Sequence, residues 1–322
     1  MTGTTATDRI EKSPKAMKRF VYYPFLSRCL HWILARIALI QTVTLFLWLA
    51  ERARNETQPP LRPWIIYLHA FVGLVGSTGL SARLLPRAAL YALTALQLHT
   101  SYIYAFHSRM IYSHWLRMRF ALHSLAASGV YLRMLGAGTI PLSGESSRVP
   151  SVEYGLYAFG VTLISAFSAV SGLLHFPLGL VTVDRETQLL EQSSIWPVFS
   201  HLNAWISGCL TVVFLAGSLA YSAPLLLTGM KHSSSVAPTD TSDSSVLERA
   251  SRLGDQFIIV GVVALTLFYD THVPYWVSIG SEFWLQIRLL LDNFIIVSGI
   301  LITSDLFSES RRIRANDSAK KE

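Results

Sequence analysis

Eight apolar runs, each about as long as a membrane-spanning α-helix, alternate along the chain with short polar segments that carry nearly all of the charge. A helix needs about 20 residues to cross about 30 Å of hydrocarbon. The period-two alternation of a transmembrane β-strand is absent from these runs. The pattern predicts an all-α, polytopic integral membrane helical bundle with about eight transmembrane helices. The predicted spans lie near residues 30–50, 63–82, 87–106, 120–140, 153–180, 199–228, 255–270 and 283–304.

The polar segments divide the chain into a membrane domain and two tails. We expect a basic cytosolic N-terminal tail at 1–29, a multi-span domain at 30–305 and a basic cytosolic C-terminal tail at 306–322. Inside the domain, the stretch 231–252 is rich in Ser, Thr and Asp, which predicts a flexible polar loop. The first 20 residues lack the apolar core of a cleavable signal peptide, so the first span is expected to act as its own anchor.

Charge is scarce and placed beside the spans. Only 15% of residues are charged, against about 25% in a soluble protein. The net charge is +7, but the basic residues form no single patch, which argues against nucleic acid as a partner. With both termini on one side, that side holds 17 lysines and arginines and the other seven. The positive-inside rule then predicts cytosolic termini, in the endomembrane system or the plasma membrane.

Three charged residues inside predicted spans are candidates for a buried polar site. Arg133 lies in the fourth, and Arg288 and Asp292 lie four residues apart on one face of the eighth. A charge at mid-bilayer costs about 2.5–3.5 kcal/mol, so such groups should be paired and face protein or water. We expect a structural Arg288–Asp292 pair, extended by Arg133 and a tyrosine or glutamine. The alternative interpretation is a polar pocket or ion path.

Histidines and cysteines are candidate ligands. The stretches around His31 and His69 look like the first two helices of bacterial di-haem b-type cytochromes, but no later span carries a same-face histidine pair. Cys29 and Cys209 are predicted to be small buried hydrophobes. No catalytic motif and no metal-ligand spacing is present, so we expect no enzyme, no cofactor and no metal.

Partners are indicated only in general terms. The apolar runs predict contact with the lipid bilayer. Ser168 and Gly172 have the small-xxx-small spacing that lets helices approach closely, within the chain or toward a homo-oligomer or another membrane protein. Asn55 begins a glycosylation sequon that the predicted topology places on the lumenal or outer side.

Several stretches in the same order carry a resemblance to a known family. They are Ala50–Ala53, Ala95–Leu98, Tyr112–Arg119, Asp270–Trp276, Glu282–Leu290, Gly299 and Thr303–Asp305. Together they resemble the transmembrane protein 101 family over residues 28–305. His114 departs from the pattern, which has an acidic residue there, and 231–252 looks like an insertion. The resemblance implies a multi-helix membrane protein that activates NF-κB signalling, with no catalytic or ligand-binding residues to carry over.

Aromatic and charged residues gather beside the fourth and eighth spans. The set is Trp115, Arg117, Arg119, Asp270, Trp276, Glu282 and Trp284. Amphipathic rings anchor helices at a membrane boundary. Because the loops 107–119 and 271–282 are predicted to share a side, we predict a lumenal cap that joins them, with Glu282 bound to Arg117 or Arg119.

Three functions follow from these patterns. The first is a non-enzymatic multi-pass membrane protein with a role in signalling, which rests on the resemblance. The second is a transporter or small-molecule carrier with a polar pocket around Arg133, Arg288 and Asp292. The third is a haem-binding electron carrier that uses His31 and His69.

Overall fold

The chain folds into helices throughout the part that its computed structural model describes, residues 14–54, 62–82, 85–106, 112, 114–137, 151–174, 203–233, 241–271, 276 and 282–319. No strand occurs among these residues, which confirms the all-α prediction for them. The helices are α1 (Pro14–Arg54), α2 (Pro63–Ser81), α3 (Pro86–Phe106), α4 (His114–Gly136), α5 (Ser151–Leu174), α7 (Asn203–Ser233), α8 (Thr241–Leu265), the π-helical turn η2 (Thr266–Asp270) and α10 (Phe283–Ala319).

Six of these helices have the length and composition to cross a membrane. They are α1 from Cys29 onward, α2, α5, α7, α10, and α8 together with η2. Two more helices, α3 and α4, have 21 and 23 residues. At a rise of about 1.5 Å per residue, both reach the thickness of the hydrocarbon core, although their sequences are more polar.

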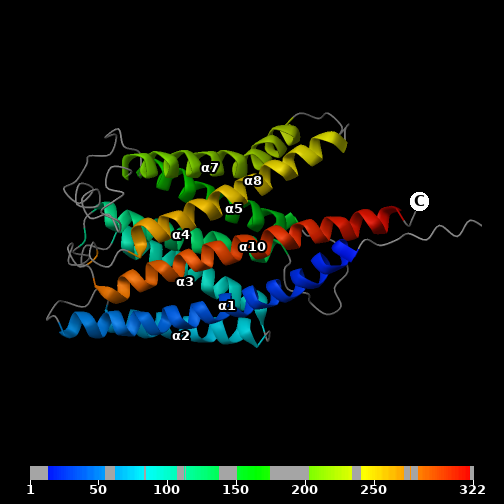
Figure 1. The fold of residues 1–322 in the computed structure, drawn as a ribbon. Coiled ribbons are helices and arrows are strands. Elements are labelled where there is room, and N and C mark those ends of the chain that lie inside the picture. The colour runs from blue at the N-terminus through cyan, green and yellow to red at the C-terminus, as the bar shows by residue number, and fades with distance from the viewer. Residues whose placement is uncertain are drawn as a thin grey trace, which may run out of the picture.

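The helices form two lobes around a shared central pair. Each helix packs against the next along the chain, and α10 closes the circuit by packing on α1. α10 also packs on α4 and α8, so α4 and α10 form the central pair. α1, α2 and α3 make the first lobe, and α5, α7 and α8 make the second, on opposite sides of that pair in Figure 1.

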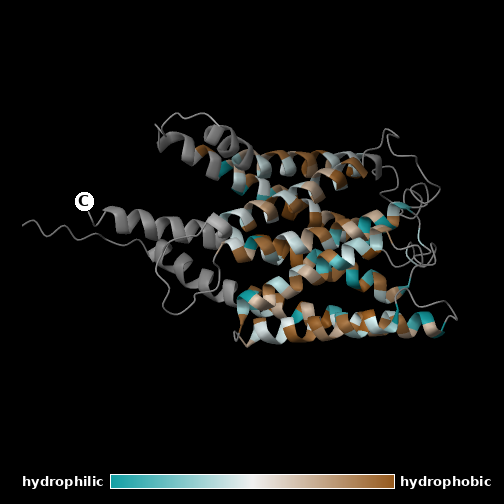
Figure 2. Ribbon diagram, turned by 180° about the vertical axis from the view of Figure 1, so that it is seen from behind, coloured by the Kyte–Doolittle hydropathy of each residue, from teal (hydrophilic) through white to brown (hydrophobic). Residues whose placement is uncertain are grey.

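The position of α4 explains its polar sequence. Eighteen of its 23 residues are buried, since α3, α5 and α10 cover it. Peripheral helices instead turn large apolar side chains outward, as Trp64 and Phe71 of α2 and Val212 and Leu219 of α7 do. Figure 2 shows hydrophobic residues along most of the described length of these outer helices. A helix enclosed by protein can therefore carry polar groups that lipid-facing helices cannot.

Some predicted boundaries differ from the structure. The predicted loop 231–252 is helical up to Ser233 and again from Thr241, so that prediction was wrong for most of its length. Ser, Thr and Asp, which suggested a loop, are also the residues that begin helices. The seventh span is correspondingly longer than the predicted 255–270, with apolar character over Arg249–Asp270.

The predicted tails also contain helix. α1 begins at Pro14 and runs through the expected boundary at 29 without a break, and α10 runs through 305 to Ala319. The start of α1 and the end of α10 lie at the same end of the bundle in Figure 1. This arrangement agrees with an even number of passes.

Candidate functional site

Four arginines are buried in the described helices, and three of them hold a carboxylate. Arg52, Arg119, Arg133 and Arg288 are only 1%, 3%, 1% and 6% exposed. A buried guanidinium is costly unless an acid and hydrogen bonds compensate it. The three ion pairs are Arg52–Glu282, Arg119–Asp270 and Arg133–Asp255. The arrangement of Arg288 is different.

Glu282 of the predicted cap pairs with an arginine other than the two that were expected. Arg52 Nε donates to Glu282 Oε1 at 2.7 Å, and Arg52 Nη2 donates to the Tyr112 hydroxyl at 3.0 Å. Tyr112 in turn donates to Glu282 Oε2. Burial and then the charge of Glu282 raise the pKa of Tyr112, which keeps the phenol protonated as a donor. Arg117 is not a partner of Glu282, because it donates to the carbonyls of Tyr104 and Ala105 at the end of α3.

A neighbouring acid fixes the start of α10. Glu51 accepts the backbone N–H groups of Phe283 and Trp284 at 3.1 and 3.2 Å. These donors have no partner inside the helix, and a negative charge is favourable at a helix N-terminus. The last turn of α1 therefore holds α10 twice, through Glu51 and through Arg52. This is where Trp284 of the predicted cap lies.

The cap pairing makes a direct prediction. Glu282→Arg should lower the free energy of unfolding by about 2 kcal/mol, because it places two partly buried cations together. Adding Arg52→Glu should recover at least half of that loss. Unfolding in detergent micelles measures both changes. Arg117→Glu in place of Arg52→Glu serves as the control, and rescue by that variant instead would contradict the observed pairing.

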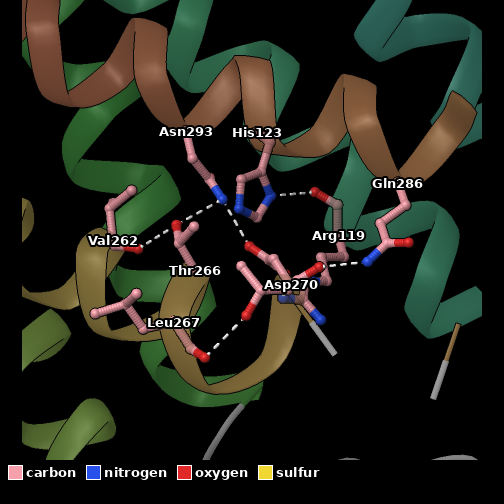
Figure 3. A network of polar contacts seen from close by, with 9 residues as sticks. Arg119, His123, Val262, Thr266, Leu267, Asp270, Gln286 and Asn293 are labelled. Carbon is pink, nitrogen blue, oxygen red and sulfur yellow. Dashed lines mark hydrogen bonds and ion pairs between the residues drawn. The ribbon is translucent and has the colours of Figure 1, made fainter. Parts of the chain in front are cut away.

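A second network joins α4, η2 and α10 (Figure 3). Asp270, fully buried, accepts from Arg119 through Oδ1 and from Asn293 Nδ2 through Oδ2 at 2.6 Å. Gln286 Nε2 donates to the Asp270 carbonyl oxygen at 2.7 Å, and Asn293 also donates to Thr266 Oγ1 at 2.9 Å. These contacts hold the π-helical turn against α10. π-helical turns interrupt helices, often at functional sites.

Two indole rings flank the guanidinium of this network. The Arg119 guanidinium carbon lies 5.3 Å from the ring centroid of Trp115 and 5.8 Å from that of Trp276. Such cation–π contacts stabilise a desolvated arginine. The predicted set of Trp115, Arg119, Asp270 and Trp276 is thus brought together. Its acid is Asp270, so Arg119 is not a partner of Glu282.

Arg133 is held in the second lobe. Its Nη1 and Nη2 donate to Asp255 Oδ1 and Oδ2 at 2.8 and 3.2 Å, a bidentate pair. Nη1 also donates to the Tyr221 hydroxyl, and Ser304 Oγ donates to Asp255 Oδ2. The prediction that Arg133 extends an Arg288–Asp292 pair was therefore wrong. Its carboxylate comes from α8, at a position where the sequence suggested only the start of a short span.

Arg288 and Asp292 remain separate. They lie one turn apart on α10, both buried, but no ion pair joins these two side chains. Asp292 Oδ1 accepts Gln41 Nε2 at 2.5 Å, and Oδ2 accepts Ser124 Oγ at 3.3 Å. Gln97 Nε2 donates to Gln41 Oε1 at 2.8 Å. The predicted pair was wrong as a contact, although the expected glutamine is present.

Two histidines lie near this cluster. His69 Nε2 and His99 Nδ1 are 2.6 Å apart, a hydrogen bond between α2 and α3. Arg288 interacts electrostatically with His69 and with Asp292. The set of Gln41, Gln97, Ser124, His69, His99, Arg288 and Asp292 is called the central polar site below.

The histidines suggested for haem are far apart. His31 lies 23 residues before the end of α1, and His69 lies six residues after the start of the adjoining α2. At about 1.5 Å per residue, their positions along the bundle differ by about 25 Å. Two axial ligands of one haem need matching depth. The described residues also contain no group of three His, Cys, Asp or Glu placed to bind a metal ion.

Sequence reasoning missed several residues of these sites. Asp255 and Glu51 were overlooked because charges near a span end are common. Gln41 and Gln97 gave a usable signal, since an amide inside an apolar run needs a buried partner. Asn55 lies outside the described residues. Ser168 Oγ donates to the Phe214 carbonyl at 2.7 Å, which places that small-residue stripe at the contact of α5 with α7.

Comparison with protein-family models, with curated proteins and with solved structures finds no match to this chain. The resemblance to the transmembrane protein 101 family stays a prediction.

Proposed function

We propose that this chain is an eight-pass membrane carrier that moves a small polar or charged solute through the central polar site. The observation that carries the proposal is the separation of Arg288 from Asp292. Three buried arginines are bound by carboxylates, whereas these two opposite charges share a helix face without touching. Ionisable groups inside a membrane domain mark substrate and ion paths unless they are fully paired.

The arrangement of helices supports the same proposal. The site takes residues from α1, α2, α3, α4 and α10, so it lies where the first lobe meets the central pair. Asp255 of the second lobe holds Arg133 of α4 in a bidentate pair. A carrier needs one part that can move against another around a fixed site. Eight passes, with α4 enclosed by its neighbours, also place both ends of the chain on one side.

Flux measurements test the proposal. The purified protein in vesicles of phosphatidylethanolamine and phosphatidylglycerol is offered labelled chloride, lactate, alanine or sodium. We expect uptake of one of them above protein-free vesicles, and loss of net uptake in Arg288→Gln and in Asp292→Asn. Both variants should elute from a sizing column as the parent does, since Asn and Gln keep the shape and much of the hydrogen bonding.

Ser298→Ala is the matched control on the same helix. The Ser298 hydroxyl donates only to carbonyls of its own helix, at Phe294 and Ile295. Its loss should leave uptake unchanged. A folded parent protein that moves none of the four solutes contradicts the carrier. An NF-κB reporter response that the whole chain elicits, and that truncation of the two end segments abolishes, would then favour the signalling role.

A further inference from the structure

The central polar site has an excess of donors. A guanidinium carries five N–H groups and no acceptor. Arg288 makes no hydrogen bond to any of the described residues, and its Nε is buried without a partner. It is 6% exposed, so water does not supply the missing acceptors freely. A buried donor left without an acceptor is unfavourable.

Both oxygens of the Asp292 carboxylate accept a hydrogen bond. Gln41 donates to one oxygen of Asp292 and Ser124 donates to the other. A metal cation would have to displace these donors. Gln97 Oε1 is one buried acceptor without a partner, and Arg288 Nε is one buried donor without a partner. The other N–H groups of Arg288 make no hydrogen bond to the described residues, so the donors outnumber the acceptors. The site is therefore short of an anion rather than of a cation.

The other charged groups around Asp292 leave this balance unchanged. Its own helix offers Arg288. The phenols of Tyr104 on α3 and Tyr131 on α4 lie within its electrostatic reach. From α1, the contact is the neutral Gln41. On another face of α10, α8 and η2 present Asp270, which Arg119 already neutralises.

The histidine pair also lies near Arg288. His69 and His99 share one hydrogen bond, and Arg288 interacts electrostatically with His69. A histidine pair carries no negative charge. It adds no counter-ion for Arg288, and Asp292 is the titratable acid that the site offers.

We propose, resting on the carrier function above, that the site binds a small monovalent anion on Arg288 together with a proton on Asp292. In the empty site the charges of Arg288 and Asp292 sum to zero. When a proton from water adds to an oxygen of Asp292, Arg288 becomes an uncompensated buried cation. A bound anion restores neutrality. Proton and anion thus enter as a pair, and both the empty and the loaded site cross the membrane interior without net charge.

Coupling is measured in the same vesicles, with the membrane potential held at zero by valinomycin and equal potassium. Pyranine inside reports the internal pH. An inward gradient of chloride, nitrate or lactate, offered singly, should acidify the interior at the rate at which the anion enters. Imposing a potential should change the initial rate less than twofold. An anion flux that follows the potential and moves no proton overturns the inference.

Two variants separate this inference from a general carrier. Arg288→Gln should abolish both net uptake and exchange of labelled for unlabelled anion. Asp292→Asn mimics the protonated acid, so it should lose net uptake and acidification by at least tenfold but retain exchange. Its empty site holds an unbalanced Arg288 and cannot return. Loss of exchange in a folded Asp292→Asn protein contradicts the inference.

The identity of the transported solute also separates the anion inference from the carrier proposal. Transport of sodium or alanine, with no flux of the anions, would leave the carrier function standing and would refute the anion. No flux of any solute through the folded protein removes both proposals together.

Discussion

Replacing Asp270 with leucine should lower the free energy of unfolding by about 3–5 kcal/mol. Asp270 is fully buried and is the carboxylate that neutralises Arg119, so its loss strands a guanidinium inside the bundle. Asn293 loses one acceptor as well, although it keeps Thr266. Unfolding titrations in mixed micelles, with loss of helical signal as the readout, measure the change.

A second substitution distinguishes a stranded charge from lost packing. Adding Arg119→Met to Asp270→Leu should recover most of the loss, because apolar groups of similar size can replace a buried ion pair. The methionine sulfur can also contact the rings of Trp115 and Trp276. Thr271→Ala is the control, since this exposed hydroxyl donates only to Leu267 of its own helix. If the double variant is no more stable than Asp270→Leu, the charge is not the cause.

The sequence was sufficient to predict that the charges inside apolar runs are buried, but not which residues they contact. The prediction that Cys29 and Cys209 are buried was wrong, since Cys29 is half-buried and Cys209 is exposed. Arg133, Arg288 and Asp292 are all buried, as their place inside apolar runs indicated. Their partners depend on how helices far apart in sequence pack. Arg133 of α4 contacts Asp255 of α8 because α8 packs on α7 and on α10, beside the central pair. The position of a residue within an apolar run indicates its depth in the membrane. It does not indicate which other helix the residue packs against.

The same reason accounts for the cap. The aromatic and charged residues around Trp115 and Trp276 were expected at one boundary, and the structure brings the indoles onto Arg119. The predicted partner of Glu282 was wrong because only arginines in the loop 107–119, which was expected to face the loop 271–282, were considered. Arg52 ends the first span, and only the packing of α1 on α10 brings it to Glu282.

The two lobes divide stability and chemistry between them. Arg133 of the central pair is bound by Asp255 of the second lobe, and Arg119 of the central pair is bound by Asp270 of η2. Ion pairs of this kind fix helix neighbours inside a medium where apolar contact alone discriminates weakly. The site around Arg288 lacks such closure. The other buried arginines each hold a carboxylate, and Arg288 makes no ion pair with the described residues.

Close approach of α4 and α5 gives the second large effect. Gly160→Ala should lower the free energy of unfolding by about 3 kcal/mol, because a Cβ there would lie 2.5 Å from the Gly129 carbonyl oxygen and 2.6 Å from the Arg133 nitrogen. Both are backbone atoms, so no side chain can turn aside and the helices must separate. That separation also pulls Arg133 from Asp255. Unfolding in micelles and cross-linking across α4 and α8 report the two effects.

Gly155 on the same helix is the matched control. A Cβ at Gly155 would meet no atom within 4 Å. Gly155→Ala should therefore be neutral or stabilise by up to about 1 kcal/mol, since alanine favours helix over glycine. The comparison keeps residue type, helix and substitution constant and varies only the distance to α4. Equal losses in the two variants would mean that glycine at 160 is needed for a reason other than the contact with α4.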